Sequence, residues 1–137
     1  MILHALALCA SAALFGGMLL YSFGFAPLLF SRLPPAEAGS LLRAAFPRYY
    51  VFVVGTALVA ALACLGLDGP AAALLGAVAA LGLVARQGLM PAINRASDAR
   101  AAGDAAAKGR FARLHGLSVA VNLVQLAAVA VALPRVG

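Results

Sequence analysis

Charged residues are scarce in this sequence, and their scarcity excludes an ordinary soluble domain. Only 10% of the 137 residues are charged, and 65% are hydrophobic. A soluble domain of this length exposes too much surface to be covered by so few charges. Several apolar runs are long enough to cross about 30 Å of hydrocarbon as helices. The composition therefore predicts an integral membrane protein whose main partner is the lipid bilayer.

The sequence also lacks the residue patterns of the common enzyme and nucleic-acid-binding classes. It contains no nucleophile elbow, phosphate-binding loop or zinc-ligand spacing. The acidic residues are Glu37, Asp68, Asp98 and Asp104, and all four lie outside the apolar runs. The net charge of +6 comes without a basic face that carries interleaved aromatic residues, so it does not indicate nucleic-acid binding. These absences favour a protein that is not an enzyme.

Four apolar runs predict an all-α fold, a four-helix transmembrane bundle that forms one domain over residues 1–137. The expected spans cover about residues 3–30, 47–66, 71–93 and 111–133. Pro47 and Pro70 stand where two of these helices would begin, a position that tolerates a missing N–H. Residues 67–70 (LDGP) predict a tight turn, so the second and third spans form an antiparallel hairpin. Within residues 31–46, apolar positions at helical spacing predict a short interfacial helix in the first cytoplasmic loop.

The positions of the basic residues predict how the chain is oriented. Nine of the ten Lys and Arg residues lie in or beside the first and third loops, and only Arg135 lies on the opposite side. The positive-inside rule then places both loops in the cytoplasm and both termini in the periplasm. Arginine outnumbers lysine nine to one, which together with abundant alanine and leucine is typical of GC-rich bacteria. We expect a multi-pass protein of the bacterial inner membrane with its first span retained.

A stripe of polar side chains runs along the last span. Spaced by three, four and three residues, its members are His115, Ser118, Asn122 and Gln125. This spacing places all four on one helix face, and lipid offers them no hydrogen-bond partners. The stripe must therefore face other protein or a wet cavity. Gln87 and Asn94, seven residues apart on the third span, are expected to face it.

These two faces predict a polar pocket between the third and fourth spans that opens toward the cytoplasm. Its expected rim comprises Tyr21, Arg48, Tyr49, Tyr50 and Arg86. Such a pocket would bind or pass a small polar solute or ion. The alternative is that the amides and hydroxyls only join helices, at roughly 0.6–2 kcal/mol per contact. His115, the one titrating group expected in the buried region, would accept a proton or bond a carbonyl of the third span.

No cofactor is predicted, although a haem- or metal-handling redox protein stays an alternative, as does a structural or assembly factor. His4 is expected at the outer end of the first span and His115 near the inner end of the last, which disfavours one haem held by both. His4, Cys9 and Cys64 fall in the outer third and are candidates for a soft metal. The simpler interpretation is that both cysteines pack as small hydrophobic residues. A disulfide between them is not excluded.

Small residues form a strip on one face of the first span. Its members are Ala10, Ala13, Gly17 and Gly24. Small side chains let a neighbouring membrane helix approach closely. Because four helices enclose little interior, we expect this strip to contact a second copy in a homo-oligomer.

Several motifs along the chain resemble those of one family. They are GGM (16–18), APLLF (26–30), FPRYY (46–50), LMPAIN (89–94) and FARLHGLS (111–118) followed by Asn122. On these motifs the sequence resembles the domain-of-unknown-function 4149 family, the transmembrane-protein-205-like integral membrane proteins, over nearly the whole chain. The resemblance implies a four-span membrane protein. It carries over no catalytic or cofactor-binding residue.

Overall fold

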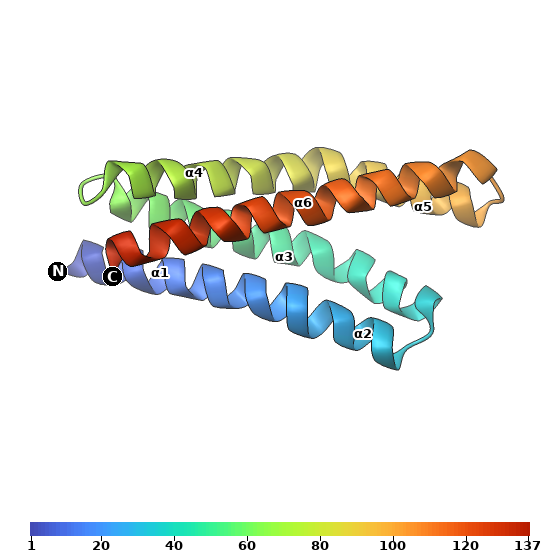
Figure 1. Cartoon of the computed structure of the whole chain (residues 1–137), viewed down its shortest axis with the longest axis horizontal. Coiled ribbons are helices and arrows are strands. Elements are labelled where there is room, and N and C mark those ends of the chain that lie inside the picture. The colour runs from blue at the N-terminus through green and yellow to red at the C-terminus, as the bar shows by residue number, and fades with distance from the viewer.

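The computed structural model describes all residues, 1–137, as helices joined by short turns (Figure 1). In chain order the elements are α1 (Ile2–Leu19), η1 (Leu20–Phe25), α2 (Ala26–Arg32), α3 (Pro35–Cys64), α4 (Gly69–Val84), η2 (Ala85–Leu89), α5 (Met90–Ala101) and α6 (Ala105–Val136). The π-helical turns η1 and η2 continue their helices, so the chain forms four long rods. All four are long and apolar enough to cross a membrane. The predicted all-α, four-span fold is confirmed, and the chain is a multi-pass membrane protein.

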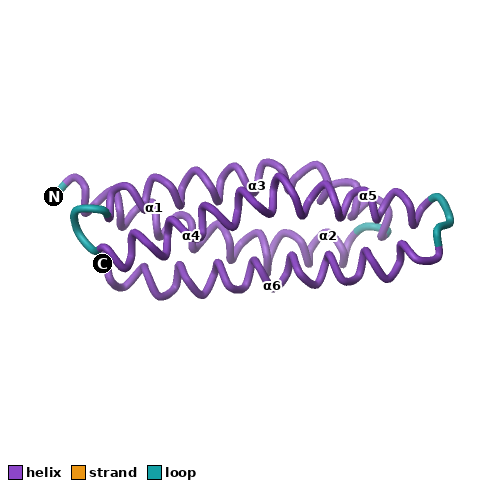
Figure 2. Tube along the Cα trace, turned by 90° about the horizontal axis from the view of Figure 1, so that it is seen from above, coloured by secondary structure: helices purple, strands orange, loops and turns teal.

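The four rods pack side by side, and each connection reverses the chain (Figures 1 and 2). Both termini and the α3–α4 turn lie at one end, which we call the terminal end. The α2–α3 and α5–α6 connections lie at the other end, called the loop end. The core of buried side chains includes Leu14, Met18, Val53, Leu75 and Val129. Toward the loop end, α2 stays beside α3 and α5 stays beside α6, while the two pairs diverge in Figure 1.

The first connection corrects one detail of the prediction. Residues 35–46 do not form a separate interfacial helix but the first turns of α3, which continues through Pro47 to Cys64. Pro47 therefore lies inside a helix and does not begin one. Ending the helix at Pro47 would leave several backbone groups unpaired at the membrane boundary, whereas continuing it loses one hydrogen bond. Pro70 does stand in the first turn of α4, as predicted.

Two prolines are accommodated by a widened turn just before them. Pro27 follows η1 and Pro91 follows η2. A proline ring clashes with the carbonyl four residues earlier in a regular α-helix, and a π-helical turn moves that carbonyl away. The first span therefore continues past Pro27 to Arg32 and does not end there. Each widened turn also rotates the following side chains relative to the preceding ones.

Ion pairs join neighbouring rods at both ends of the bundle. Arg135 of α6 donates to Asp68 at 3.1 Å, and the same carboxylate caps α4 by accepting the Ala71 N–H at 2.7 Å. These two donors, Arg135 first, hold the pKa of Asp68 below its usual value. At the loop end, Arg43 of α3 donates to both oxygens of Asp98 on α5, at 2.6 and 3.1 Å. The terminal-end pair fixes the α3–α4 turn against α6, and the loop-end pair joins the α3 and α5 sides.

Part of the strip of small residues on the first span packs against another helix of the same chain. A Cβ added at Gly17 would collide with the ring of Phe52 on α3. Gly17 thus lets α1 and α3 approach closely, as small residues do between membrane helices. The homo-oligomer prediction loses the support of this position and stays a prediction.

Candidate functional site

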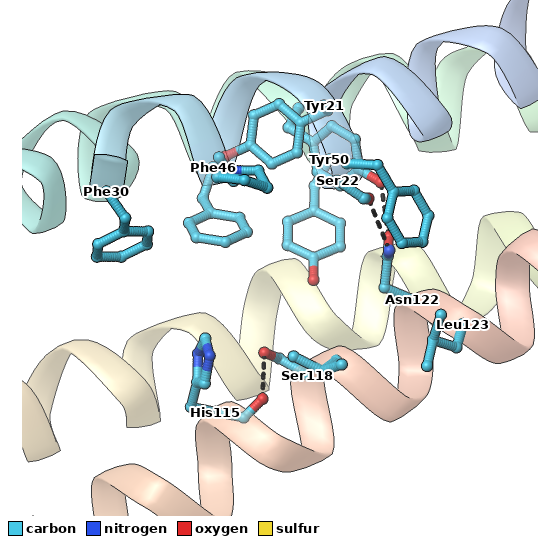
Figure 3. Close-up of a pocket in the computed structure, with 14 residues that line it drawn as sticks. Tyr21, Ser22, Phe30, Phe46, Tyr50, His115, Ser118, Asn122 and Leu123 are labelled. Atoms are coloured by element: carbon cyan, nitrogen blue, oxygen red, sulfur yellow. Dashed lines mark hydrogen bonds between the residues drawn. The ribbon is translucent and has the colours of Figure 1, made fainter. Parts of the chain in front are cut away.

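A cavity of about 290 Å³ lies toward the loop end, between the first span, α3 and α6 (Figure 3). We call it the aromatic cavity. It is lined by Tyr21, Ser22, Phe23, Ala26, Pro27, Phe30, Phe46, Tyr49, Tyr50, His115, Ser118, Val119, Asn122 and Leu123. Its size is near the lower end of the range for small-molecule sites. The cavity lies where the two helix pairs diverge.

Asn122 closes the deep end of the aromatic cavity by bonding two other spans. Its Oδ1 accepts a hydrogen bond from the Tyr49 hydroxyl at 2.7 Å, and its Nδ2 donates to Ser22 Oγ at 2.8 Å. Tyr49 comes from α3 and Ser22 from η1, so one amide connects three of the four spans (Figure 3). Asn122 lies seven residues beyond His115 on α6, which is about 10 Å deeper at the α-helical rise.

Aromatic rings form a large part of the cavity wall, with six Phe or Tyr residues among the fourteen that line it. Six of the ten phenylalanine and tyrosine residues of the chain line it. Tyr21 stacks on Tyr49 with ring centroids 4.0 Å apart, and Phe46 stacks on Tyr50 at 6.2 Å. Tyr21 also meets the ring of Phe46 edge-on at 5.6 Å. These ring contacts are of the stacked and edge-to-face kinds that aromatic pairs prefer, and they join the first span to α3.

Two hydroxyl groups of the aromatic cavity have no partner within the protein. Tyr50 extends from α3 toward Ser118 on α6 (Figure 3), and its hydroxyl makes no hydrogen bond. The Tyr21 hydroxyl is buried and also unpartnered. Ser118 donates to the His115 carbonyl at 2.8 Å, which leaves its oxygen free to accept. The cavity therefore offers hydrogen-bonding groups to a molecule inside it.

His115 lies at the edge of the cavity and is exposed, which corrects the prediction of a buried titrating group. Its imidazole stacks on Phe111 of the same helix, with centroids 5.9 Å apart and the planes nearly parallel. Arg100 of α5 lies over the other ring of this pair, 4.3 Å from the Phe111 centroid. His115 can thus contact a ligand at the opening of the cavity.

The predicted pocket between the third and fourth spans is only partly present. Asn94 lines a second cavity of about 40 Å³, beside Tyr50, His115 and Ser118. Gln87 is exposed and lines neither cavity. The reason is η2, the widened turn that contains Gln87 and shifts its face relative to that of Asn94. The larger cavity faces the first and second spans instead.

The predicted rim residues divide into two groups. Tyr21, Tyr49 and Tyr50 line the cavity itself. Arg48 is exposed and donates to the Ala44 carbonyl one turn earlier at 2.9 Å. Arg86 lines neither cavity, and its Nε is buried without a partner. Neither arginine therefore forms part of the site.

Gln125, the deepest member of the polar stripe, lies outside the aromatic cavity. Only 1% of the residue is exposed, and its Nε2 donates to the Val78 carbonyl of α4 at 2.9 Å. Its Oε1 is buried without a partner. Gln125 thus contacts α4, whereas Asn122 contacts α3 and the first span.

The candidate metal ligands stay apart. Both cysteines are free thiols, with Cys9 exposed and Cys64 buried. His4 is exposed near the start of α1. No group of three or more His, Cys, Asp or Glu side chains is brought together. The structure therefore does not assemble the set His4, Cys9 and Cys64.

Sequence reasoning missed Ser22, Phe30 and Phe46 as parts of the site. A signal was present, because nine of the ten phenylalanine and tyrosine residues fall within residues 15–52. Such a concentration in the first two spans indicates that these spans share an aromatic contact. Ser22 carried no signal of its own, since its partner lies 100 residues away.

Comparison with known proteins identifies one family. A family model described as "Domain of unknown function (DUF4149)" matches residues 9–102, well over half of the chain. The match runs from within α1 to the end of α5 and includes every cavity residue except those of α6. No curated protein and no solved structure matches the chain.

Proposed function

This protein belongs to the DUF4149 family, and we propose that it binds a small molecule in the aromatic cavity. The ligand would lie between the aromatic rings and accept a hydrogen bond from Tyr50. Binding needs no catalytic group, which agrees with the lack of acidic residues in the lining. The proposal refines the sequence-based expectation of a site for a small polar solute or ion.

The observation that carries the proposal is the Tyr50 hydroxyl, which reaches into a cavity of about 290 Å³ without a partner. Phenylalanine would fill the same space with no polar group to satisfy. A ligand oxygen that accepts this hydrogen bond gains about 0.5–1.5 kcal/mol, so binding is favoured.

Binding is better supported than passage of a solute through the bundle. Between Asn122 and the terminal end, the interior is filled by Leu14, Met18 and Val129, none of which has exposed surface. A conducting path needs polar groups along its length, whereas the only buried polar side chains in this interior are Ser11 and Gln125. The aromatic cavity therefore ends inside the bundle.

A cavity-filling substitution tests the proposal. Ala26→Phe adds a ring to the cavity wall and should prevent binding, because it occupies the space of the ligand. We expect native mass spectrometry of protein released from cell membranes by mild detergent to show a small-molecule adduct on the unmodified protein. Ala26→Phe should lose this adduct.

The matched control is Ala77→Phe, the same change at an exposed position of α4 outside the cavity. This variant should keep the adduct. An adduct that survives Ala26→Phe, with helix content unchanged by circular dichroism, contradicts the proposal. Absence of any adduct on the unmodified protein contradicts it as well.

We also propose that the loop end faces the cytoplasm of a bacterial inner membrane. The basic residues of the α2–α3 and α5–α6 connections support this orientation through the positive-inside rule. In a variant without Cys9 and Cys64, Gly66→Cys should react with a membrane-impermeant maleimide in intact cells. Ala102→Cys should react only after the cells are opened. The reverse pattern contradicts the proposed orientation.

A further inference from the structure

The opening of the aromatic cavity is formed by apolar side chains that the protein itself leaves uncovered. Phe23 is 62% exposed, Phe30 54% and Leu123 48%. These residues lie in membrane-spanning helices, the first two on the first span and the third on α6. Exposed apolar side chains in a spanning segment face lipid. The cavity therefore opens sideways, between the first span and α6, into the bilayer.

The walls of the aromatic cavity suit a flat ligand. Stacked pairs such as Tyr21 with Tyr49 present ring faces and edges. Few flexible aliphatic side chains line the cavity. Flat rings pack on such surfaces in offset or edge-to-face contacts worth about 0.5–1.5 kcal/mol beyond the area buried. A flexible acyl chain gains no such contacts.

The polar groups favour neutral oxygen atoms and disfavour a cation. The Tyr50 hydroxyl lines the cavity without a partner and can donate a hydrogen bond, and carbonyl oxygens are suitable acceptors. No acidic side chain lines the cavity, and the basic residues of the neighbouring loops repel positive charge. The ligand should therefore carry carbonyl or hydroxyl oxygens and no positive charge.

The size of the cavity limits the ligand further. A volume of about 290 Å³ corresponds to roughly ten water molecules in the liquid. This is room for one substituted ring, but not for the two acyl chains of a phospholipid. A longer tail would have to leave through the opening between Phe30 and Leu123.

We infer that the aromatic cavity takes from the bilayer a lipid whose head is a flat ring bearing carbonyl or hydroxyl oxygens, the chemistry of an isoprenoid quinone. The ring lies against Tyr21, Tyr49 and Phe46, and the Tyr50 hydroxyl donates to a ring oxygen. The apolar tail passes between the first span and α6 into the membrane. This inference rests on the proposed function and names the ligand class of the same site.

The chain supplies its own reporter for the test. It contains three tyrosines and no tryptophan, and all three tyrosines line the cavity. Tyrosine fluorescence therefore reports on this cavity alone. We expect a benzoquinone with one isoprenoid unit, added to protein in phosphatidylcholine vesicles, to quench the fluorescence saturably. Excess farnesol, an isoprenoid alcohol without a ring, should not reverse this quenching.

Variants separate binding from collisional quenching. Ala26→Phe should remove the saturable part, and Ala77→Phe should keep it. Tyr50→Phe, which keeps the ring and loses only the hydroxyl, should raise the quinone concentration for half-saturation several-fold. Vesicles of phosphatidylcholine brominated in the upper half of its acyl chains should also quench the tyrosines of the unmodified protein, because the opening faces lipid. Lack of quenching by brominated lipid overturns the sideways opening.

The inference and the proposed function can fail separately. Displacement of the quinone by farnesol overturns the ring-bearing ligand and leaves small-molecule binding intact. The ring-bearing ligand is also overturned if the quinone gives no saturable response while native mass spectrometry shows an adduct of another chemical class. Small-molecule binding then stands. No response to any probe and no adduct overturns both.

Discussion

Replacing Asn122 with leucine is expected to destabilise the protein and to abolish ligand binding. The Asn122 side-chain amide forms one hydrogen bond with Tyr49 at 2.7 Å and one with Ser22 at 2.8 Å, and leucine can form neither. Side-chain hydrogen bonds between membrane helices contribute about 0.6–2 kcal/mol each, so the loss of two should cost about 1–4 kcal/mol. The measurement is the unfolding free energy in mixed detergent micelles, followed by circular dichroism.

Binding should fall for a geometric reason. The Asn122 amide fixes the Tyr49 hydroxyl and the first span at the deep end of the cavity, and Tyr49 stacks on Tyr21. Without the amide, the ring that forms one wall is free to move. The quinone-dependent quenching of tyrosine fluorescence should therefore disappear or require at least several-fold more ligand.

Double substitutions show whether the cost arises from these two bonds. In protein that already carries Tyr49→Phe and Ser22→Ala, Asn122→Leu has no partners left to unpair. Its additional cost should then be small, because residues in one hydrogen-bond network are not additive. If Asn122→Leu alone stabilises the protein, the amide is neither part of a site nor a useful contact between helices.

The fold was predictable because membrane spans are determined by apolar runs, which a sequence shows directly. Four such runs and the positions of the basic loops gave the number of helices and which connections share an end. The prediction that Pro47 begins a helix was wrong, because proline at a helix start and proline inside a helix cannot be told apart in a sequence. Only the backbone cost of a break at the membrane boundary decides between them.

The site was only half predictable, because helical spacing fails across a widened turn. Asn122 and Gln125 lie on regular α6, and both bond other helices as their spacing indicates. Gln87 and Asn94 were assigned to one face by a spacing of seven, but Gln87 lies inside η2 and is exposed. Neighbouring antiparallel spans were assumed to share the pocket, whereas Asn122 bonds the first and second spans.

The polar stripe thus contains residues of two kinds, and Gln125 is expected to differ from Asn122 in every response. Its Oε1 is buried without a partner, and its Nε2 donates to a carbonyl of α4 at 2.9 Å. Leucine of similar volume loses that one bond and removes the unpaired oxygen. Gln125→Leu should therefore leave the unfolding free energy unchanged or raise it by up to about 1 kcal/mol.

Truncation at the same position should have the opposite effect. Gln125→Ala leaves a cavity where α4 and α6 are in close contact, since a Cβ at Gly82 would lie 3.4 Å from Gln125 Nε2 and 2.9 Å from Val54 Cγ2. The neighbours cannot move in to fill the gap, so the loss should be about 2 kcal/mol or more. The same detergent unfolding experiment measures both variants.

Ligand binding separates the two residues further. Because Gln125 lies outside the aromatic cavity, Gln125→Leu should keep the quinone-dependent quenching that Asn122→Leu loses. The two substitutions make the same kind of change, amide to leucine, three residues apart on one helix. Loss of binding in Gln125→Leu would mean that the site reaches deeper along α6 than the cavity lining indicates. Retention of binding together with raised stability would assign Gln125 to helix packing alone.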